Sequence, residues 1–366
     1  MPVVRVAVNG FGRIGRCFMR ASLCRPGTVE VVAVNDTNEP DMLAYLLEHD
    51  TVQGLLRFPV TVEPGALVVG TDRVTVTRKR DPAKLPWGEL GIDVVIESTG
   101  RFTMADEAAA HLEAGAGRVI ISAPATGADL TVCMGVNHDR FDPERHRIVS
   151  NASCTTNCLA AMVYVLHDRF ELLDGFMSTV HAYTNDQNLL DLPHRGHTRD
   201  LRRGRAAAQN IVPSSTGAAR AIGEVLPELA GRLDGMAFRV PVACGSVTDL
   251  VATLGRPVTN HEVGEAFAAA AAEPRFAGIL GVTDRPIVSS DIIGQSYSCL
   301  FSTCDTMTNA SRVKVLGWYD NEWGYSNRLL ELAALIGTPR ETALAGHTGH
   351  TGGSGGSQPT RRISVR

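Results

Sequence analysis

The sequence predicts an α/β fold in which a mostly parallel sheet wound with helices is followed by an α+β unit with a mostly antiparallel sheet. Two observations lead to this fold class. Short valine-rich runs alternate with helix patterns over the first 150 residues, whereas longer and more polar strand patterns follow after residue 170. Alternating strand and helix patterns are typical of parallel sheets covered on both faces.

The elements follow in order along the chain. In the first half, the patterns predict strands over 3–8, 29–34, 74–77, 94–97 and 119–121, and helices over 16–23 and 105–114. In the second half, they predict helices over 155–169 and 327–335, and strands over 175–183, 235–242, 246–254, 297–302 and 313–319. We therefore expect two domains, 1–152 and 153–320, with a closing helix in 321–337 that completes the first. The Gly/Ser-rich segment 338–366 has too few apolar residues to order itself and is predicted to be a disordered tail.

Composition excludes several classes of protein. The 366 residues are 44% hydrophobic and carry a net charge of −4, which argues against nucleic-acid binding. No apolar run of about 18 residues indicates a membrane span, and no leader pattern is apparent at the N-terminus. The eight cysteines lack the spacing of a zinc site, so no metal is predicted. We expect a soluble protein of the reducing cytoplasm.

A glycine-rich turn between the first strand and the first helix predicts a Rossmann-type dinucleotide site. Gly10, Gly12 and Gly15 form the pattern G-x-G-x-x-G, and Asp36 ends the next strand. The glycines allow a tight turn, close approach of a pyrophosphate and close packing of the helix. A carboxylate at Asp36 accepts hydrogen bonds from ribose hydroxyls and repels a 2′-phosphate, which favours NAD.

Cys154 stands where a helix is predicted to begin, because Thr155, Thr156 and Asn157 are turn and cap residue types and an apolar run follows them. Unpaired backbone N–H groups and the helix dipole at such a position favour the thiolate. His181 follows in a strand pattern and is the candidate base for this nucleophile. The same pattern is also compatible with a structural, buried cysteine. Cys158, one turn later, is expected to pack in the core.

Several motifs resemble phosphorylating glyceraldehyde-3-phosphate dehydrogenase over about residues 3–336. The matching segments are Asn9-Gly10-Phe11-Gly12-Arg13-Ile14-Gly15-Arg16, Ser98-Thr99-Gly100-Arg101-Phe102, Ser122-Ala123-Pro124, Ser150-Asn151-Ala152-Ser153-Cys154-Thr155-Thr156-Asn157, His181-Ala182-Tyr183-Thr184, Ser215-Thr216-Gly217-Ala218-Ala219 and Trp318-Tyr319-Asp320-Asn321-Glu322-Trp323-Gly324-Tyr325-Ser326-Asn327. The resemblance implies oxidation of D-glyceraldehyde 3-phosphate to 1,3-bisphosphoglycerate in glycolysis, with NAD as cofactor and inorganic phosphate as second substrate. It also implies a homotetramer.

The resemblance further assigns roles to individual residues. Cys154 would form a thiohemiacetal and then a thioester, and His181 would move the proton. The cofactor site would comprise Gly10, Phe11, Gly12, Arg13, Ile14, Gly15, Asp36, Arg80, Thr99, Ser122, Asn321 and Tyr325. The substrate C3 phosphate would bind at Thr184, Asp186 and Arg239, and the attacking phosphate at Ser153, Thr155, Thr216 and Gly217.

The chain also departs from the family pattern. About four extra residues lie near Gly196–Arg199, and Cys244-Gly245 replaces a segment that commonly contains asparagine. Such changes leave open a specialised, inhibitor-tolerant copy of the enzyme. An erythrose-4-phosphate dehydrogenase shares this fold and thiol chemistry, but Thr184 and Ser215-Thr216-Gly217 favour the glyceraldehyde enzyme. At a greater distance, the complete N-G-F-G-R-I-G and Y-D-N-E-W-G-Y motifs argue against a semialdehyde dehydrogenase. The presence of every predicted catalytic residue argues against a non-catalytic binding protein on the same scaffold.

Overall fold

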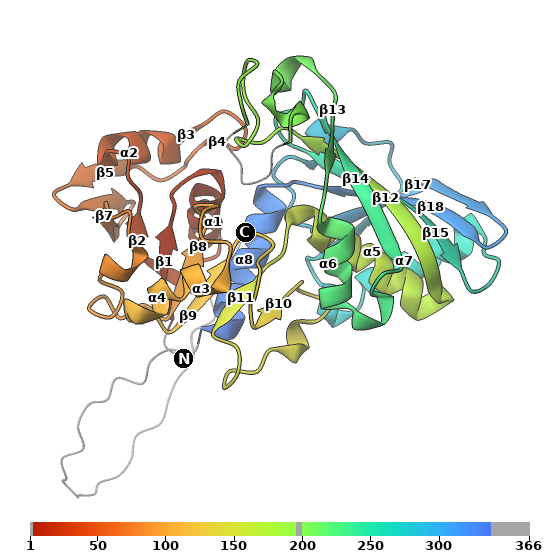
Figure 1. Cartoon of the computed structure of the whole chain (residues 1–366), viewed down its shortest axis with the longest axis horizontal. Helices are drawn as coiled ribbons and strands as arrows, with labels where there is room; N and C mark the ends of the chain where they lie inside the picture. Colours follow the sequence, from red (N-terminus) through yellow and green to blue (C-terminus); the bar gives the residue numbers. More distant parts are fainter. Residues whose placement is uncertain (1–2, 195–199, 338–366) are drawn as a thin grey trace, which may run out of the picture.

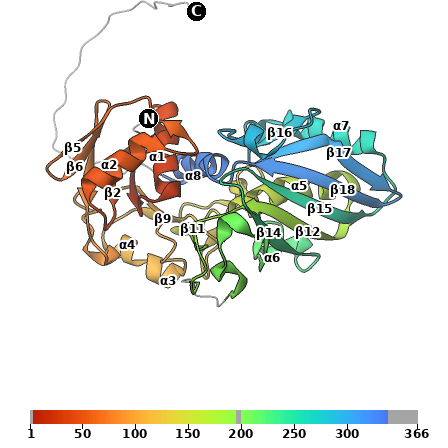
Figure 2. The same cartoon turned by 90° about the horizontal axis from the view of Figure 1, so that it is seen from above.

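Two large sheets organise the protein, and a computed structural model describes them over residues 3–194 and 200–337. The first sheet lies in the N-terminal half and the second in the C-terminal half, side by side in both views (Figures 1 and 2). Two regions singled out in the sequence, the insertion near residues 196–199 and the tail 338–366, lie outside the described residues.

The first sheet has nine strands in the order β10-β11-β9-β8-β1-β2-β7-β6-β5. The strands from β10 to β7 pair in parallel, as the alternating pattern predicts, whereas β5, β6 and β7 form an antiparallel meander that the pattern did not reveal. The strands are β1 (Val4–Asn9), β2 (Val29–Asn35), β5 (Val60–Glu63), β6 (Ala66–Val69), β7 (Asp72–Thr77), β8 (Val94–Glu97), β9 (Arg118–Ile121), β10 (Leu130–Thr131) and β11 (Ile148–Ser150). A separate hairpin joins β3 (His49–Asp50) to β4 (Gly54–Leu55).

Four helices in the first half accompany this sheet: α1 (Arg13–Cys24), α2 (Pro40–Glu48), α3 (Ala105–Ala108) and α4 (Ala110–Glu113). The single helix predicted over 105–114 is therefore interrupted. At the interruption, the Leu112 N–H donates to Ala109 O, an i→i+3 bond that tightens the turn.

The second sheet has seven strands in the order β13-β14-β12-β15-β18-β17-β16. Most of its pairs are antiparallel, as predicted, and β12 with β14 and β16 with β17 are parallel. The strands are β12 (Leu172–Ala182), β13 (Val212–Ser215), β14 (Leu233–Val240), β15 (Ser246–Leu254), β16 (Leu280–Thr283), β17 (Cys299–Asn309) and β18 (Arg312–Tyr319).

One face of the second sheet is buried and the other is open. Three helices cover the buried face: α5 (Cys154–Phe170), α6 (Ala218–Val225) and α7 (Asn260–Ala271). The opposite face carries apolar side chains that remain exposed, among them Phe176 at 75% and Met307 at 60%. An exposed apolar sheet face of this kind is typical of an association surface.

The last helix, α8 (Trp323–Ile336), returns to the first sheet. It packs against α1, and its Leu329, Leu330 and Ile336 join the apolar core of the N-terminal half. This position agrees with the closing helix expected in 321–337. In the part of the chain that the structure describes, no helix is both long and apolar enough to cross a membrane.

Candidate active site

Cys154 is presented by a strand–turn–helix unit. Strand β11 ends at Ser150, and Ala152 then adopts φ +53, a left-handed conformation that is costly for a residue with a Cβ. The Ser153 hydroxyl caps α5 by accepting the Thr156 N–H at 3.0 Å, so the helix begins at Cys154 as the sequence predicts. The turn thus holds the thiol at the positive end of a 17-residue helix.

His181 lies opposite this thiol near the end of β12, with its Nε2 atom 3.4 Å from Cys154 Sγ. Its Nδ1 atom lies 2.7 Å from the Ala182 carbonyl, which can only accept, and 2.9 Å from Arg239 Nη1, which can only donate. Nδ1 can therefore be satisfied with or without its proton. The ring can present Nε2 to the thiol as an acceptor or as a donor, which suits a group that takes up and returns one proton.

Burial dominates the electrostatics of this pair. It raises the pKa of the Cys154 thiol to about 11, although the Arg239 charge and hydrogen bonding at Thr155 act to lower it. It also lowers the pKa of His181 to about 3, with Arg239 acting in the same direction. Burial thus opposes the thiolate that a helix N-terminus favours. Transfer of the proton from Sγ to Nε2 creates both charges together, and their mutual attraction offsets the cost of burying each.

A cluster of charged groups adjoins the pair. The Arg239 Nη1 atom donates to the Ala182 carbonyl at 3.0 Å and to the Thr184 hydroxyl at 3.1 Å. The Thr184 hydroxyl in turn donates to Asp186, and the Asp186 carboxylate accepts Arg203 Nη1 at 2.6 Å. The structure thus brings together the three residues predicted for the C3 phosphate. It adds Arg203, which sequence reasoning missed although it lies in an arginine-rich run.

The four residues predicted for the attacking phosphate have different surroundings. The Thr155 side chain is buried, and its hydroxyl lies 2.8 Å from Tyr319 OH, so this hydroxyl is engaged in the core. Thr216 accepts the Ala218 N–H at 3.2 Å, and Gly217 caps α6 with no side chain, in open space. Ser153 and Gly217 each stand at the N-terminus of a helix, a position that favours anions.

The glycine turn has the shape that a dinucleotide requires. Gly10 has φ +92, and a Cβ there would lie 2.6 Å from Thr99 N, whereas a Cβ on Gly15 would lie 2.4 Å from Gly10 O. A Cβ on Gly12 would meet nothing within 4 Å. The space is therefore open at the start of α1, where the helix has no side-chain cap and its N–H groups can receive a pyrophosphate. These residues fit NAD.

Asp36 lies beside this turn but already holds hydrogen bonds. Its Oδ2 atom accepts the Phe11 N–H at 2.9 Å, and its Oδ1 atom accepts from Asn38. A carboxylate has about four acceptor positions, so some remain for ribose hydroxyls. Asp36 therefore shapes the glycine turn in addition to its predicted role.

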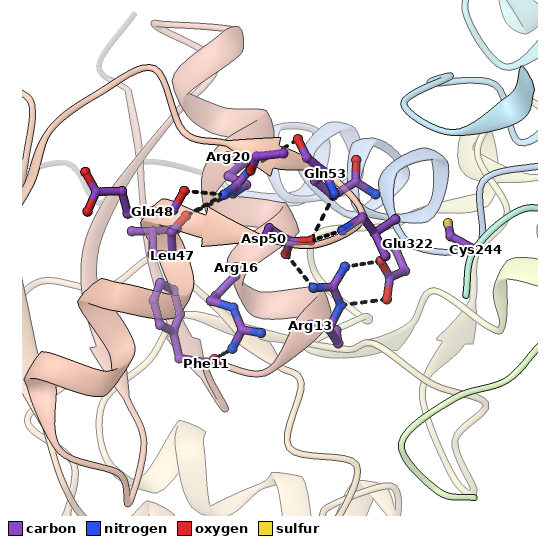
Figure 3. Close-up of polar contacts among 12 residues, drawn as sticks. Phe11, Arg13, Arg16, Arg20, Leu47, Glu48, Asp50, Gln53, Cys244 and Glu322 are labelled. Atoms are coloured by element: carbon purple, nitrogen blue, oxygen red, sulfur yellow. Dashed lines mark hydrogen bonds and ion pairs between the residues drawn. The ribbon is translucent and has the colours of Figure 1, made fainter. Parts of the chain in front are cut away.

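Arg13 is engaged elsewhere than the motif suggests. Its guanidinium forms a fork with both carboxylate oxygens of Glu322 and also contacts Asp50 (Figure 3). Burial alone lowers the pKa of Arg13, but Glu322 and Asp50 outweigh it and the net pKa is raised. The side chain thus ties the start of α1 to the start of α8. Only its backbone N–H, at the helix N-terminus, is placed for a cofactor phosphate.

The remaining cofactor candidates follow the carboxyl ends of neighbouring strands, where ligands of open α/β sheets bind. Thr99 and Ser122 follow β8 and β9, and the exposed Arg80 follows β7. Ile14, in the first turn of α1, is half-buried against the N-terminal core. Thr99, Ser122 and Arg80 thus follow strands that end at one edge of the sheet.

Asn321 and Tyr325 lie close to the catalytic turn. Asn321 Oδ1 accepts the Gly245 N–H at 3.2 Å and the Ser246 hydroxyl at 2.9 Å. This acceptor role fixes the amide so that its NH₂ group is the end left to donate. The Tyr325 hydroxyl donates to the Ala152 carbonyl at 2.9 Å and so braces the residue before Ser153. Cys154 and Tyr325 line one small pocket.

Comparison with known proteins gives concordant matches. Residues 4–105 match the family model "Glyceraldehyde 3-phosphate dehydrogenase, NAD binding domain", and residues 153–321 match "Glyceraldehyde 3-phosphate dehydrogenase, C-terminal domain". The chain is 57% identical over 337 residues to glyceraldehyde-3-phosphate dehydrogenase 2 of Streptomyces arenae, covering 92% of this chain and 99% of that protein.

Two further relatives extend this comparison. Glyceraldehyde-3-phosphate dehydrogenase 1 of Streptomyces avermitilis is 58% identical over 336 residues, covering 91% of this chain and 98% of the relative. The glyceraldehyde-3-phosphate dehydrogenase of Geobacillus stearothermophilus is 53% identical over 336 residues, with 92% and 98% covered. With a Rossmann-type cofactor edge, a cysteine at a helix N-terminus and a facing histidine in one molecule, the chain belongs to the glyceraldehyde-3-phosphate dehydrogenase family.

Proposed function

We propose that this protein oxidises D-glyceraldehyde 3-phosphate to 1,3-bisphosphoglycerate, with reduction of NAD and uptake of inorganic phosphate. The observation that carries the proposal is the 3.4 Å contact between Cys154 Sγ and His181 Nε2 at the start of α5. A nucleophile within reach of a base at a helix N-terminus is suited to attack on a carbonyl carbon.

The reaction begins when Cys154 Sγ attacks the aldehyde carbon and its proton passes to His181 Nε2. The resulting thiohemiacetal carries an oxygen close to the start of α5, whose N–H groups stabilise negative charge there. NAD, held by Gly10, Gly12 and the start of α1, would supply the hydride acceptor that oxidation of the thiohemiacetal to a thioester requires. His181 then holds the proton that the reaction releases.

The thioester carbon is next attacked by inorganic phosphate, and the carbon–sulfur bond breaks to give an acyl phosphate and the free thiolate. Ser153 and the Thr216–Gly217 turn would bind the attacking phosphate. Arg239, with Thr184 beside it, would bind the C3 phosphate of the substrate. Arginine suits this role because its planar fork donates to two phosphate oxygens at once.

The test is NADH formation by the purified protein with glyceraldehyde 3-phosphate, with and without inorganic phosphate. The proposal expects phosphate-dependent turnover that Cys154→Ser abolishes, whereas the matched variant Cys158→Ser retains most activity because its thiol is buried in the core. Erythrose 4-phosphate is the comparison substrate. Preference for the four-carbon sugar, or no turnover by a folded, NAD-binding protein, would contradict the proposal.

We also propose a homotetramer. The outer face of the second sheet supports self-association, because it carries five exposed apolar residues on β14, β12, β15 and β17: Phe176, Val180, Met236, Val251 and Met307. Native mass spectrometry is expected to give four copies, and Phe176→Asp is expected to yield smaller assemblies. A monomeric native protein would contradict this assignment.

The division of the chain and its compartment complete the proposal. The boundary of the NAD domain would lie at Ala152, directly before the catalytic turn, with α8 completing that domain. All eight cysteines are free thiols, which fits the reducing cytoplasm.

A further inference from the structure

Four fully buried polar side chains form a continuous hydrogen-bonded chain beneath the cofactor edge of the first sheet. Trp87 Nε1 donates to His111 Nδ1 at 3.0 Å, and His111 Nε2 lies 3.0 Å from Glu97 Oε2. Asn9 Nδ2 donates to the same oxygen at 2.5 Å. Each of these four residues is at most 2% exposed. A buried polar network this complete is costly unless every member is satisfied.

The donors and acceptors of this network have a definite order. The indole N–H can only donate, so His111 Nδ1 accepts and the ring proton of neutral His111 lies on Nε2. That proton points to Glu97, as does the Asn9 amide. Glu97 therefore accepts a hydrogen bond from each of these neighbours, as a carboxylate can. A side-chain amide could not replace it, because one end of an amide only donates.

The second oxygen of Glu97 leads to the cofactor edge. Glu97 Oε1 accepts the Thr99 N–H at 2.8 Å and the Thr99 hydroxyl at 2.5 Å. In the same loop, the Ser98 hydroxyl donates to Gly10 O at 2.7 Å. The loop therefore lies directly against the first glycine of the fingerprint, where Gly10 has no room for a Cβ.

Asn9 extends the network in the other direction. Its Oδ1 atom accepts Asn35 Nδ2 at 2.7 Å, and Asn35 Oδ1 accepts the Lys79 N–H at 2.9 Å. Asn35 precedes Asp36, and Lys79 precedes Arg80. The network thus joins the carboxyl ends of β1, β2, β7 and β8, and all four ends carry residues predicted to bind NAD.

We propose that Glu97, held by Trp87, His111 and Asn9, is a positioning residue for NAD. It acts through Thr99 and the Gly10 turn, without touching the cofactor itself. This inference rests on the cofactor site described above, but it does not depend on the proposed reaction. A network of this kind sets the spacing of four strand ends before the cofactor arrives, so that less ordering is needed on binding.

The experiment compares Glu97→Gln with Asp93→Asn. Asp93 is a second buried carboxylate, at the opposite end of the same strand, and accepts the Arg5 N–H at 2.9 Å. NAD affinity is measured by calorimetric titration of the full-length protein without substrate, in a Cys154→Ser background that prevents turnover. Glu97→Gln is expected to weaken NAD binding about tenfold or more, because the NH₂ group that replaces one carboxylate oxygen would face the N–H donors of its neighbours. Asp93→Asn is expected to stay within about twofold of the parent.

A second variant and a second readout keep the proposal falsifiable. Trp87→Phe removes the indole donor together with part of the buried ring, and it is expected to weaken NAD binding about two- to tenfold with the fold retained. In the background with Cys154 intact, KM for the sugar phosphate at saturating NAD is expected to remain unchanged. Unchanged NAD affinity in folded Glu97→Gln or Trp87→Phe would overturn the proposal, as would an equal loss in Asp93→Asn. Failure of the proposed reaction would leave these binding results unaffected.

Discussion

Replacement of His181 by glutamine isolates what burial does to the catalytic thiol. Without the ring, no base lies 3.4 Å from Cys154 Sγ to receive its proton, while the burial that raises the thiol pKa to about 11 remains. A thiol with that pKa is ionised to about one part in ten thousand at about pH 7. The variant is therefore expected to react through a small population of thiolate.

The assay is alkylation of Cys154 by iodoacetamide in the absence of substrate, followed by mass spectrometry as a function of pH. In His181→Gln, the rate is expected to rise about tenfold per pH unit throughout the neutral range, because only the thiolate reacts. The native protein, with its proton acceptor in place, is expected to react roughly 10²–10⁴-fold faster near neutrality. Cys154→Ser gives the background labelling.

Equal alkylation rates in the two proteins at neutral pH would refute the reasoning. That result would mean that the helix N-terminus and Arg239 produce the thiolate alone. A variant rate that is slow but independent of pH would refute it as well, since the thiol would then be limited by access and not by ionisation.

Three further predictions concern the cofactor turn, the ion pairs and the substrate site. Gly12→Ala is expected to fold with native stability, because its Cβ enters open space, but to bind NAD weakly in titration calorimetry, because the pyrophosphate needs that space. Gly10→Ala is expected to unfold at a lower urea concentration, since its Cβ meets Thr99 N at 2.6 Å. Equal stabilities of the two variants would contradict this prediction. Asp50→Asn is expected to cost about 2 kcal/mol in urea unfolding near neutrality. Burial raises the pKa of Asp50, but the Gln53 N–H and Arg13 outweigh it and the net pKa is lowered. The stabilisation by this carboxylate is therefore present above its ordinary pKa and is lost as the pH falls through the pKa of the folded state. A stability difference between native protein and variant that widens in acid would contradict this prediction. Arg203→Gln is expected to raise KM for the sugar phosphate at least severalfold with unchanged NAD affinity, and steady-state kinetics with an unchanged KM would reject a role in phosphate binding.

Local chemistry explains which elements could be predicted. The start of α5 was predicted to within one residue because the turn and cap residue types Thr155, Thr156 and Asn157 directly precede an apolar run, although the structure places the cap at Ser153. Two missed helices also carried local signals. Pro40 stands at the first position of α2, and Thr259 and Glu262 form a capping box at the start of α7. Those helices could have been predicted from these signals.

Long-range polar contacts explain what could not be predicted. The resemblance assigned Arg13 to the cofactor site, but it carried no signal that the Arg13 side chain pairs with Glu322, 309 residues later in the chain. Asn9 and Glu97 are 88 residues apart, and no motif contains both of them. Spacing along a chain carries no information on such contacts, because they depend on the order of strands in the sheet.

The same distinction separates the binding groups of the site from those that support them. Cys154, His181 and the fingerprint glycines are recognised from short motifs because each must approach a ligand directly. Glu97 and Glu322 instead hold the loops and helices from which those groups project, and any fold that placed a carboxylate there would serve. A motif therefore identifies the chemistry of the site, whereas the precision of its geometry resides in buried partners that only the folded chain reveals.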